Sequence, residues 1–193
     1  MSDCVSDGHL ITQLQGGDLD ALGALYERYK ARVYRTALAI TREPAAAEDL
    51  LQDTFLRLHK YAHRINASLP LEPWLYRVTV NLAFTRQARQ KRWLVPLETV
   101  LDRLASPNRL PEWQVEMDDL HGRIVAAIAE LPFNQRTVVV LFYLNALNLK
   151  EIAYILNCPV GTVKSRLHYG RENLIRRLAT EPRPIPEVVY EYA

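Results

Sequence analysis

Residues 145–177 of the chain read NALNLKEIAYILNCPVGTVKSRLHYGRENLIRR, and this stretch predicts a helix, a tight turn and a second helix. The apolar residues of the first helix recur at helical spacing and make one stripe, at Leu149, Ile152, Ala153 and Leu156. The stripe stops at residues 157–159, Asn-Cys-Pro, because Asn tolerates a helix-ending conformation and Pro cannot continue a helix. A second helix can therefore start directly after this turn.

The second predicted helix has one apolar and one polar face. Its inner stripe consists of Val160, Val163, Leu167, Gly170, Leu174 and Leu178. Its outer face consists of Lys164, Ser165, His168, Arg171 and Glu172. A basic helix held against a partner by a short turn is typical of a helix-turn-helix, whose second helix enters the DNA major groove. The pattern alone also permits an αα-hairpin with a solvated charged face.

The residues of this motif favour the DNA-binding interpretation. Residues 149–167, LKEIAYILNCPVGTVKSRL, resemble the helix-turn-helix that recognises the promoter −35 element in bacterial sigma factors, especially the extracytoplasmic-function (ECF) group. Response regulators share part of the motif, but they would open with a parallel α/β receiver, and no strand–helix alternation precedes it here. Just before the motif the family usually has Gly. Asn145-Ala146 stands there in this chain and is compatible with a bend because Asn tolerates positive φ.

The resemblance implies which side chains contact the −35 element. They are Thr162, Lys164, Ser165, Arg166, His168, Tyr169 and Arg171. Tyr169 stands where family members commonly have Arg, and tyrosine cannot make the bidentate contact to guanine that arginine makes. Base choice is therefore expected to rest more on Lys164, Ser165 and His168, with Arg166 and Arg171 mainly on phosphates.

Composition favours an all-α protein. The chain has 193 residues, 49% of them hydrophobic and only 7 glycines, and long stretches of helical periodicity alternate with Pro-marked breaks. The net charge of +2 is too small to imply nucleic-acid binding by itself, but the charge is segregated along the chain. Separate acidic and basic segments can therefore contact different partners.

Cysteine use and hydropathy point to a cytoplasmic protein. Cys4 and Cys158 make neither a disulfide framework nor a metal-ligand spacing, which fits a reducing compartment. The longest apolar run, residues 138–144, is far short of the roughly 20 residues that span a bilayer, and no signal peptide opens the chain. We therefore expect no direct membrane insertion.

An acidic helix is predicted after Pro44. Its outer face carries Glu48, Asp49, Gln52 and Asp53. The helix dipole alone favours acids at the first two of these positions, but it weakens at the other two, which lie beyond the first turn. Residues 47–58 resemble the sigma-factor helix that docks on the clamp helices of core RNA polymerase. The resemblance implies polymerase contacts from Glu48, Asp49, Gln52, Asp53 and Phe55.

Two histidines near the end of that helix raise the alternative of a metal site. His59 and His63 are four residues apart, which could place both imidazoles on one helical face. There is no His-Glu-x-x-His setting and no third ligand nearby, so a solvent-facing or phosphate-facing pair is favoured. We expect no metal and no cofactor.

A basic helix follows, over residues 74–92. Arg77, Arg86, Arg89, Lys91 and Arg92 supply five positive charges, residues 77–92 contain no acid, and aromatic residues are interleaved. A solvated surface is one explanation, and binding to phosphates and unpaired bases is another. Residues 73–84 resemble the sigma-factor helix that reads and opens the −10 element, and the preceding loop in that family holds a base flipped out of the melted promoter. The implied −10 residues are Arg64, Asn66, Ser68, Trp74, Arg77, Asn81, Arg86 and Arg89.

These segments predict two small helical domains joined by a flexible acidic linker, the C-terminal one a helix-turn-helix. A mobile lead-in covers residues 1–17, with one turn of helix around residues 10–14. The first domain, similar to sigma region 2, covers residues 18–93, and the second, similar to region 4, covers residues 120–179. Residues 94–119 form the linker, with six acids, two bases and Pro96, Pro107 and Pro111. Residues 180–193 are expected to be a disordered tail.

The chain is thus identified as resembling an ECF sigma factor. The resemblance implies a protein that binds core RNA polymerase and directs promoter recognition, DNA melting and transcription initiation. Its expected partners are core polymerase, promoter DNA and an anti-sigma factor, with no small-molecule substrate and no enzyme activity. One alternative is a helix-turn-helix repressor or activator that binds paired half-sites independently of polymerase. The other is a helical enzyme using His59 and His63, which no phosphate loop or nucleophile motif supports.

Overall fold

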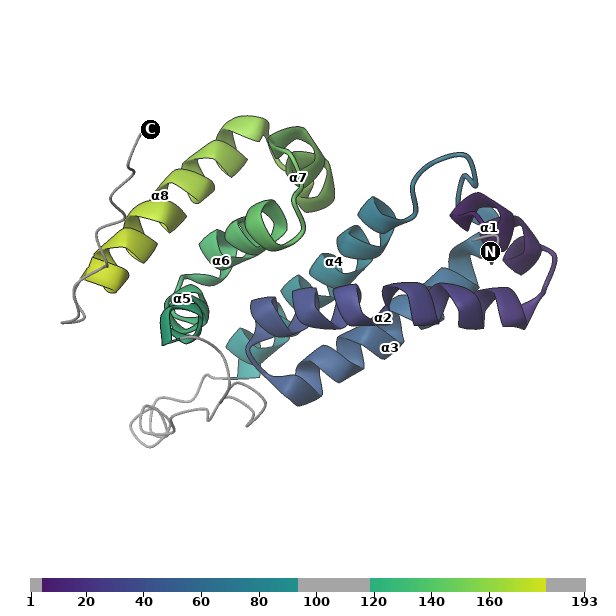
Figure 1. The fold of residues 1–193 in the computed structure, drawn as a ribbon, viewed down its shortest axis with the longest axis horizontal. Helices are drawn as coiled ribbons and strands as arrows, with labels where there is room; N and C mark the ends of the chain where they lie inside the picture. The colour runs from purple at the N-terminus through teal and green to yellow at the C-terminus, as the bar shows by residue number, and fades with distance from the viewer. Residues whose placement is uncertain (1–4, 94–118, 180–193) are drawn as a thin grey trace, which may run out of the picture.

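The computed structural model describes residues 5–93 and 119–179, and these residues form helices without strands (Figure 1). The prediction of an all-α protein is confirmed. The helices, in chain order, are α1 (Asp7–Gln15), α2 (Leu19–Thr41), α3 (Pro44–Tyr61), the 3₁₀ turn η1 (Ala62–Arg64), α4 (Glu72–Trp93), α5 (Asp119–Ala129), α6 (Phe133–Val139), the π-helical turn η3 (Val140–Leu144), α7 (Leu149–Leu156) and α8 (Val160–Ala179). The predicted linker, apart from Asp119, and the predicted tail lie outside the described residues.

Helices α1 to α4 form the N-terminal group. Asp18 caps α2, because its carboxylate accepts the amide of Asp20 at 2.9 Å, and Pro44 occupies the first turn of α3. One face of α2 is buried against α3 and α4, through Ala21, Leu25, Tyr29, Val33, Ala37 and Ile40. The buried hydroxyls of Thr54 in α3 and Thr79 in α4 lie 3.1 Å apart, within hydrogen-bond distance, and link the two helices. The apolar faces of α2, α3 and α4 therefore hold this group together.

The N-terminal lead-in differs from the expectation. Residues 7–15 form helix α1, whose Leu10, Ile11 and Leu14 are buried against the N-terminal group. Ser6 caps this helix, and Asp7 accepts hydrogen bonds from Arg28 and from the hydroxyl of Tyr29. The flanking glycines and polar residues concealed the short apolar stripe that drives this packing.

Helices α5 to α8 form the C-terminal group and contain the predicted helix-turn-helix. Asn148 and Glu151 make a capping box that starts α7, and Asn157 ends α7 in the left-handed conformation with φ 47°. Val163 and Leu167 of α8 face the interior. Gly170 lies so close to α6 that a Cβ there would stand 2.8 Å from the Cγ2 atom of Val139. The helix-turn-helix is thus the one that the sequence predicts.

The bend before α7 is made differently from the expectation. Asn145 keeps φ −100°, and the positive φ of 52° falls on Ala146. The Asn145 side chain instead donates a hydrogen bond to the Thr36 hydroxyl of α2, at 2.8 Å. Asn145 therefore serves a long-range contact, and the strain of the left-handed conformation is carried by an alanine.

The two groups pack against one another. A single apolar cluster joins Ala37 and Ile40 of α2 and Val80 of α4 to Val138 of α6 and Ile152 of α7. In Figure 1 the green α6 and α7 lie alongside the purple-to-blue α2 and the teal α4. Sequence periodicity predicted two domains but gave no sign of this contact.

Candidate polymerase and nucleic-acid interface

The acidic face of α3 is solvent-exposed. Glu48, Asp49, Gln52 and Asp53 all lie on the surface of the N-terminal group. Leu56, one turn further along the same face, is 56% exposed and was missed because it is a single apolar residue outside the buried stripe. The four polar residues and Leu56 therefore form one solvent-accessible face of α3.

Phe55 does not share this exposure. It is buried, and its ring packs edge-on against Tyr26 with the ring centroids 5.0 Å apart. Phe55 therefore holds α3 against α2, and its expected direct contact with polymerase is replaced by a supporting role. The sequence carried a signal for this burial, because Phe55 lies three residues before Leu58 and therefore on the same inward face of the helix.

Arg86 was expected to contact −10 DNA, but the structure places it between α3 and α4. Its guanidinium lies 3.1 Å from Asp49 Oδ2 and 3.4 Å from Glu43 Oε2. Its Nε is buried and has no hydrogen-bond partner among the described residues. Arg86 is thus engaged by Glu43, which precedes α3, and by Asp49, which the resemblance assigned to the polymerase contact.

The remaining predicted −10 residues of α4 are divided between surface and interior. Asn81 and Arg89 are exposed, whereas Trp74 is half-buried against the core of the N-terminal group. Arg77 is half-buried, with its guanidinium carbon 4.5 Å from the ring centroid of Tyr154 in α7. Cation–π contact with the C-terminal group therefore occupies one of the predicted −10 residues, Arg77.

The loop between η1 and α4 is exposed and locally ordered by its own side chains. Arg64, Asn66 and Ser68 are on the surface, and Asn66 Oδ1 accepts the amide of Ser68 at 2.9 Å. Leu69, 63% exposed, lies beside them and was not singled out by the sequence. Polar groups and an exposed apolar side chain on one short loop are suited to an unpaired base, which offers edges and a flat face.

Helix α1 packs against the base of this loop. The Gln15 side-chain amide donates to the carbonyls of Ala62 at 3.0 Å and Ile65 at 2.8 Å. A Cβ on Gly8 would collide with the carbonyl oxygen of Ala67. The segment expected to be a mobile lead-in therefore contacts the base of the loop at two places.

The histidines that suggested a metal site lie on separate elements. His59 is on α3, whereas His63 is in η1, where its Nε2 accepts a hydrogen bond from Arg64 at 3.2 Å. The described residues contain no group of three or more His, Cys, Asp or Glu side chains that could hold a metal ion.

Helix α8 presents its predicted outer face to solvent. Lys164, Ser165, His168, Tyr169 and Arg171 are exposed, and Thr162 and Arg166 are half-buried. Arg171 is held by the π-helical turn: its Nε donates to the Tyr143 hydroxyl at 2.7 Å, and its guanidinium carbon lies 5.3 Å from the ring centroid of Phe142. Tyr143 is a neighbour that the sequence did not predict, because it lies outside the helix-turn-helix.

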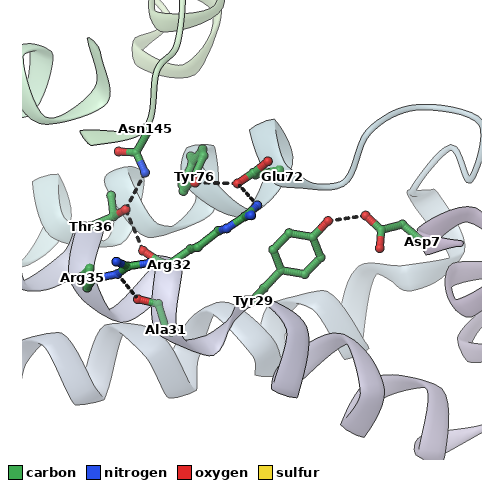
Figure 2. A network of polar contacts seen from close by, with 9 residues as sticks. All are labelled: Asp7, Tyr29, Ala31, Arg32, Arg35, Thr36, Glu72, Tyr76 and Asn145. Atoms are coloured by element: carbon green, nitrogen blue, oxygen red, sulfur yellow. Dashed lines mark hydrogen bonds and ion pairs between the residues drawn. The ribbon is translucent and has the colours of Figure 1, made fainter. Parts of the chain in front are cut away.

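A polar network joins the two groups (Figure 2). The Tyr76 hydroxyl of α4 donates to Glu72 at 2.7 Å, and Arg32 of α2 donates to the same carboxylate oxygen at 2.9 Å. Burial, together with the hydrogen bond to Glu72, raises the pKa of Tyr76 to about 12. In the same view Asn145 reaches down from the C-terminal group to Thr36.

Both the N-terminal and the C-terminal group match known family models. Residues 25–93 match the model for sigma-70 region 2, and residues 121–174 match the model for sigma-70 region 4. The first range covers most of α2 to α4, and the second covers nearly all of α5 to α8. The two models, in this order, define a bacterial transcription initiation factor of the sigma-70 class.

Relatives identify the family within this class. The chain is 34% identical over 176 residues to the ECF RNA polymerase sigma factor SigW of Bacillus subtilis, covering 87% of this chain and 94% of that protein. It is 34% identical over 152 residues to SigM of the same organism, covering 78% and 90%, and 29% identical over 184 residues to the ECF sigma-E factor of Escherichia coli, covering 89% and 94%. The chain belongs to the ECF RNA polymerase sigma factors, and its function is promoter recognition in association with RNA polymerase.

Solved structures share the fold. CnrH in complex with the cytosolic domain of CnrY aligns with a TM-score of 0.64 at 21% identity, covering 91% of this chain and 98% of that one. The sigma factor RpoE of Bartonella quintana, in complex with the anti-sigma factor NepR, aligns with a TM-score of 0.63 at 22% identity, covering 79% and 92%. Of the described residues, no helix is long and apolar enough to cross a membrane.

Proposed function

We propose that the chain docks on core RNA polymerase through α3, reads and opens the −10 element with α4 and the loop at residues 65–71, and binds the −35 element with α8. The observation that carries this proposal is the exposed acidic face of α3, with Glu48, Gln52 and Asp53 beside the exposed Leu56. In this assignment the chain carries out no catalysis itself and works in the cytoplasm with polymerase as the enzyme.

The domain limits follow from the same assignment. The N-terminal domain comprises residues 18–93 with α1 packed onto it, and the C-terminal domain comprises residues 120–179, so that residues 94–119 connect them. An anti-sigma factor is a further proposed partner, because the solved complex of RpoE with NepR pairs a protein of this fold with such a regulator.

Charge reversal on α3 tests the polymerase contact. We expect Asp53→Arg to weaken binding to core polymerase by about tenfold or more, equivalent to about 1.4 kcal/mol, because it places a cation where the partner surface complements an anion. The same reversal at Glu27, an exposed acid of α2 whose pair with Lys30 is on the surface, is the matched control. Competition for core polymerase and thermal unfolding should be measured for both variants. Equal binding of the two proteins would remove α3 as the docking surface.

The loop assignment is tested through the helix that supports it. We expect Gln15→Ala to reduce discrimination at the captured −10 base by about three- to tenfold, because the loss of two hydrogen bonds, each of about 1 kcal/mol, loosens the base of the loop. Gln13→Ala is the control, since Gln13 lies in the same helix and shows no bond to the loop among the described contacts. Selection of −10 variants with holoenzyme made from each protein gives the readout. A preference left intact by Gln15→Ala would mean that α1 does not position the loop.

A further inference from the structure

Tyr143, near the end of the π-helical turn η3, is an aromatic residue that packing does not explain. It is 56% exposed, so it gains little from burial, and it lies outside the helix-turn-helix. The turn continues α6, which runs beside α8 (Figure 1). From there the Tyr143 hydroxyl accepts a hydrogen bond from Nε of Arg171 in α8, at 2.7 Å. The contact therefore joins an exposed side chain to the helix assigned to the −35 element.

The π-helical turn brings two neighbouring rings to the same guanidinium. Asn145 donates its amide to the Val140 carbonyl at 3.2 Å, five residues back, so this turn is wider than an α-helical one. The guanidinium carbon of Arg171 lies 5.3 Å from the ring centroid of Phe142 and 5.4 Å from that of Tyr143. Consecutive side chains of a regular α-helix point about 100° apart, whereas here both rings contact one cation. The turn therefore holds Arg171 in one place.

The hydrogen bond between these residues leaves both with unused donors. A tyrosine hydroxyl that accepts one bond still has its own proton to donate, and the guanidinium keeps the N–H groups of its Nη atoms. No described residue accepts from the Tyr143 hydroxyl or from the Nη atoms of Arg171. The neighbouring acid, Glu172, has its Oε1 atom 3.5 Å from Nε2 of His168. A neutral and a cationic donor thus meet at the surface, an arrangement that suits an oxyanion with several acceptor oxygens.

The position of Arg171 along α8 indicates which oxyanion this is. Arg171 follows Lys164 by seven residues, so it lies on the same face and about 10 Å further along the helix. The major groove is about 12 Å wide, and a recognition helix reads base edges with its N-terminal residues. A side chain two turns beyond the predicted base contact of Lys164 therefore reaches the phosphates at the wall of the groove.

We propose that the Tyr143 hydroxyl and the Arg171 guanidinium together form a binding site for one backbone phosphate of the −35 element. Tyr143 is then a DNA contact outside the helix-turn-helix. This inference rests on the proposed function of α8. The hydroxyl donates to one phosphate oxygen and the Nη groups donate to another, while the bond from Nε to the hydroxyl is kept. Because that bond and the two rings already hold the guanidinium in the free protein, little side-chain freedom is lost on binding.

Tyr143→Phe tests the hydroxyl alone, because it keeps the ring beside Arg171. The probe is a duplex promoter that wild-type holoenzyme selects from a library randomised at the −35 element, with a neutral methylphosphonate in place of one −35 phosphate at a time. One such replacement should weaken wild-type binding by about tenfold or more. Tyr143→Phe should weaken binding to the unmodified duplex about fivefold, the effect of one hydrogen bond, and binding to that modified duplex by less than about twofold.

Salt dependence separates the roles of the two residues. Arg171→Ala removes a cation, so it should lower the slope of log affinity against log salt by about 0.9, whereas Tyr143→Phe should weaken binding at an unchanged slope. Asn173→Ala is the control in the same helix, because it removes a 2.8 Å hydrogen bond to Gln135 between α8 and α6. This variant should keep the wild-type affinity and the wild-type response to each methylphosphonate.

The outcomes separate this inference from the function on which it rests. An unchanged affinity of Tyr143→Phe, or an equal loss on the unmodified and on every modified duplex, would overturn the phosphate site. Weaker competition of Tyr143→Phe for core polymerase, with unchanged binding of the assembled holoenzyme to the duplex, would also overturn it and would assign Tyr143 to the polymerase. A wild-type holoenzyme that selects no −35 sequence would instead overturn the assignment of α8.

Discussion

Replacing Arg136 by Met is expected to lower the free energy of unfolding by about 3 kcal/mol. The guanidinium donates to three backbone carbonyls, of Ile40 at 2.9 Å, Ala129 at 2.8 Å and Leu131 at 3.0 Å, and the side chain is only 4% exposed. Bonds from a charged donor contribute about 1.5–3 kcal/mol each, and methionine would leave the carbonyls without this donor.

Relief of a buried charge works against this loss. Burial, together with the positive charge of nearby Arg42, lowers the pKa of Arg136 to about 10, so desolvation and charge repulsion together oppose folding with the cation by about 3 kcal/mol. Three such bonds together exceed that penalty, whereas a single bond would at most equal it. We therefore expect a net destabilisation by Arg136→Met. The stability of Arg136→Lys should lie between those of Arg136→Met and the wild type, because an ammonium group cannot reproduce the hydrogen-bond geometry of the guanidinium.

Urea unfolding of both variants would check this balance. Arg35→Met is the matched control, because Arg35 is exposed and bonds only to the Ala31 carbonyl of its own helix in the described contacts. If Arg136→Met were as stable as Arg35→Met, the free-energy cost of desolvating the Arg136 cation would equal or exceed the stabilisation from its three hydrogen bonds.

Replacing Gly170 by Leu is the second change with a large expected effect, a loss of about 3 kcal/mol or more of stability in the C-terminal domain. Even a Cβ at this position would stand 2.8 Å from Cγ2 of Val139, which is 1% exposed and branched at its own Cβ. Neither side chain can move aside, so α8 must separate from α6. Since α8 carries the predicted −35 contacts, their placement would be lost together with stability.

The same helix supplies the control. A Cβ at Gly161 would meet no described atom within 4 Å outside its own helix, and leucine is a better helix former than glycine. Gly161→Leu should therefore be neutral or slightly stabilising in thermal unfolding. Equal destabilisation by the two substitutions would show that glycine matters for the backbone of α8 and not for its closeness to α6.

The sequence was sufficient for features that depend on local spacing. The period of α8 predicted its buried face, which includes Val163, Leu167 and Gly170, and Asn157 marked the end of α7 because its left-handed conformation follows from residue type. The exposed faces of α3 and α8 follow from the same periodicity. Their assignment to polymerase and to −35 DNA came from resemblance and stays a prediction at the level of single residues.

Contacts between residues far apart in the chain could not be predicted from the sequence. Nothing around Arg86 indicates that Asp49 and Glu43 would face it, because the three residues meet only after α3 folds onto α4. Helix α1 was missed because nine residues with three apolar side chains are marginal alone and form a helix through packing. The interface between the domains, including the bond of Asn145 to Thr36, has no local pattern at all.

We expect the Arg86 ion pairs to couple the binding of polymerase to the binding of promoter DNA. On the proposed assignment, Asp49 belongs to the surface that faces polymerase, while Arg86 belongs to the helix that faces the −10 strand. A polymerase cation that draws Asp49 away releases the guanidinium for a promoter phosphate. By reciprocity, a phosphate at Arg86 increases the affinity for polymerase by the same factor. The complex of this protein with both polymerase and promoter would then be more stable than the two separate binding affinities predict, because both partners compete with the same Asp49–Arg86 ion pair.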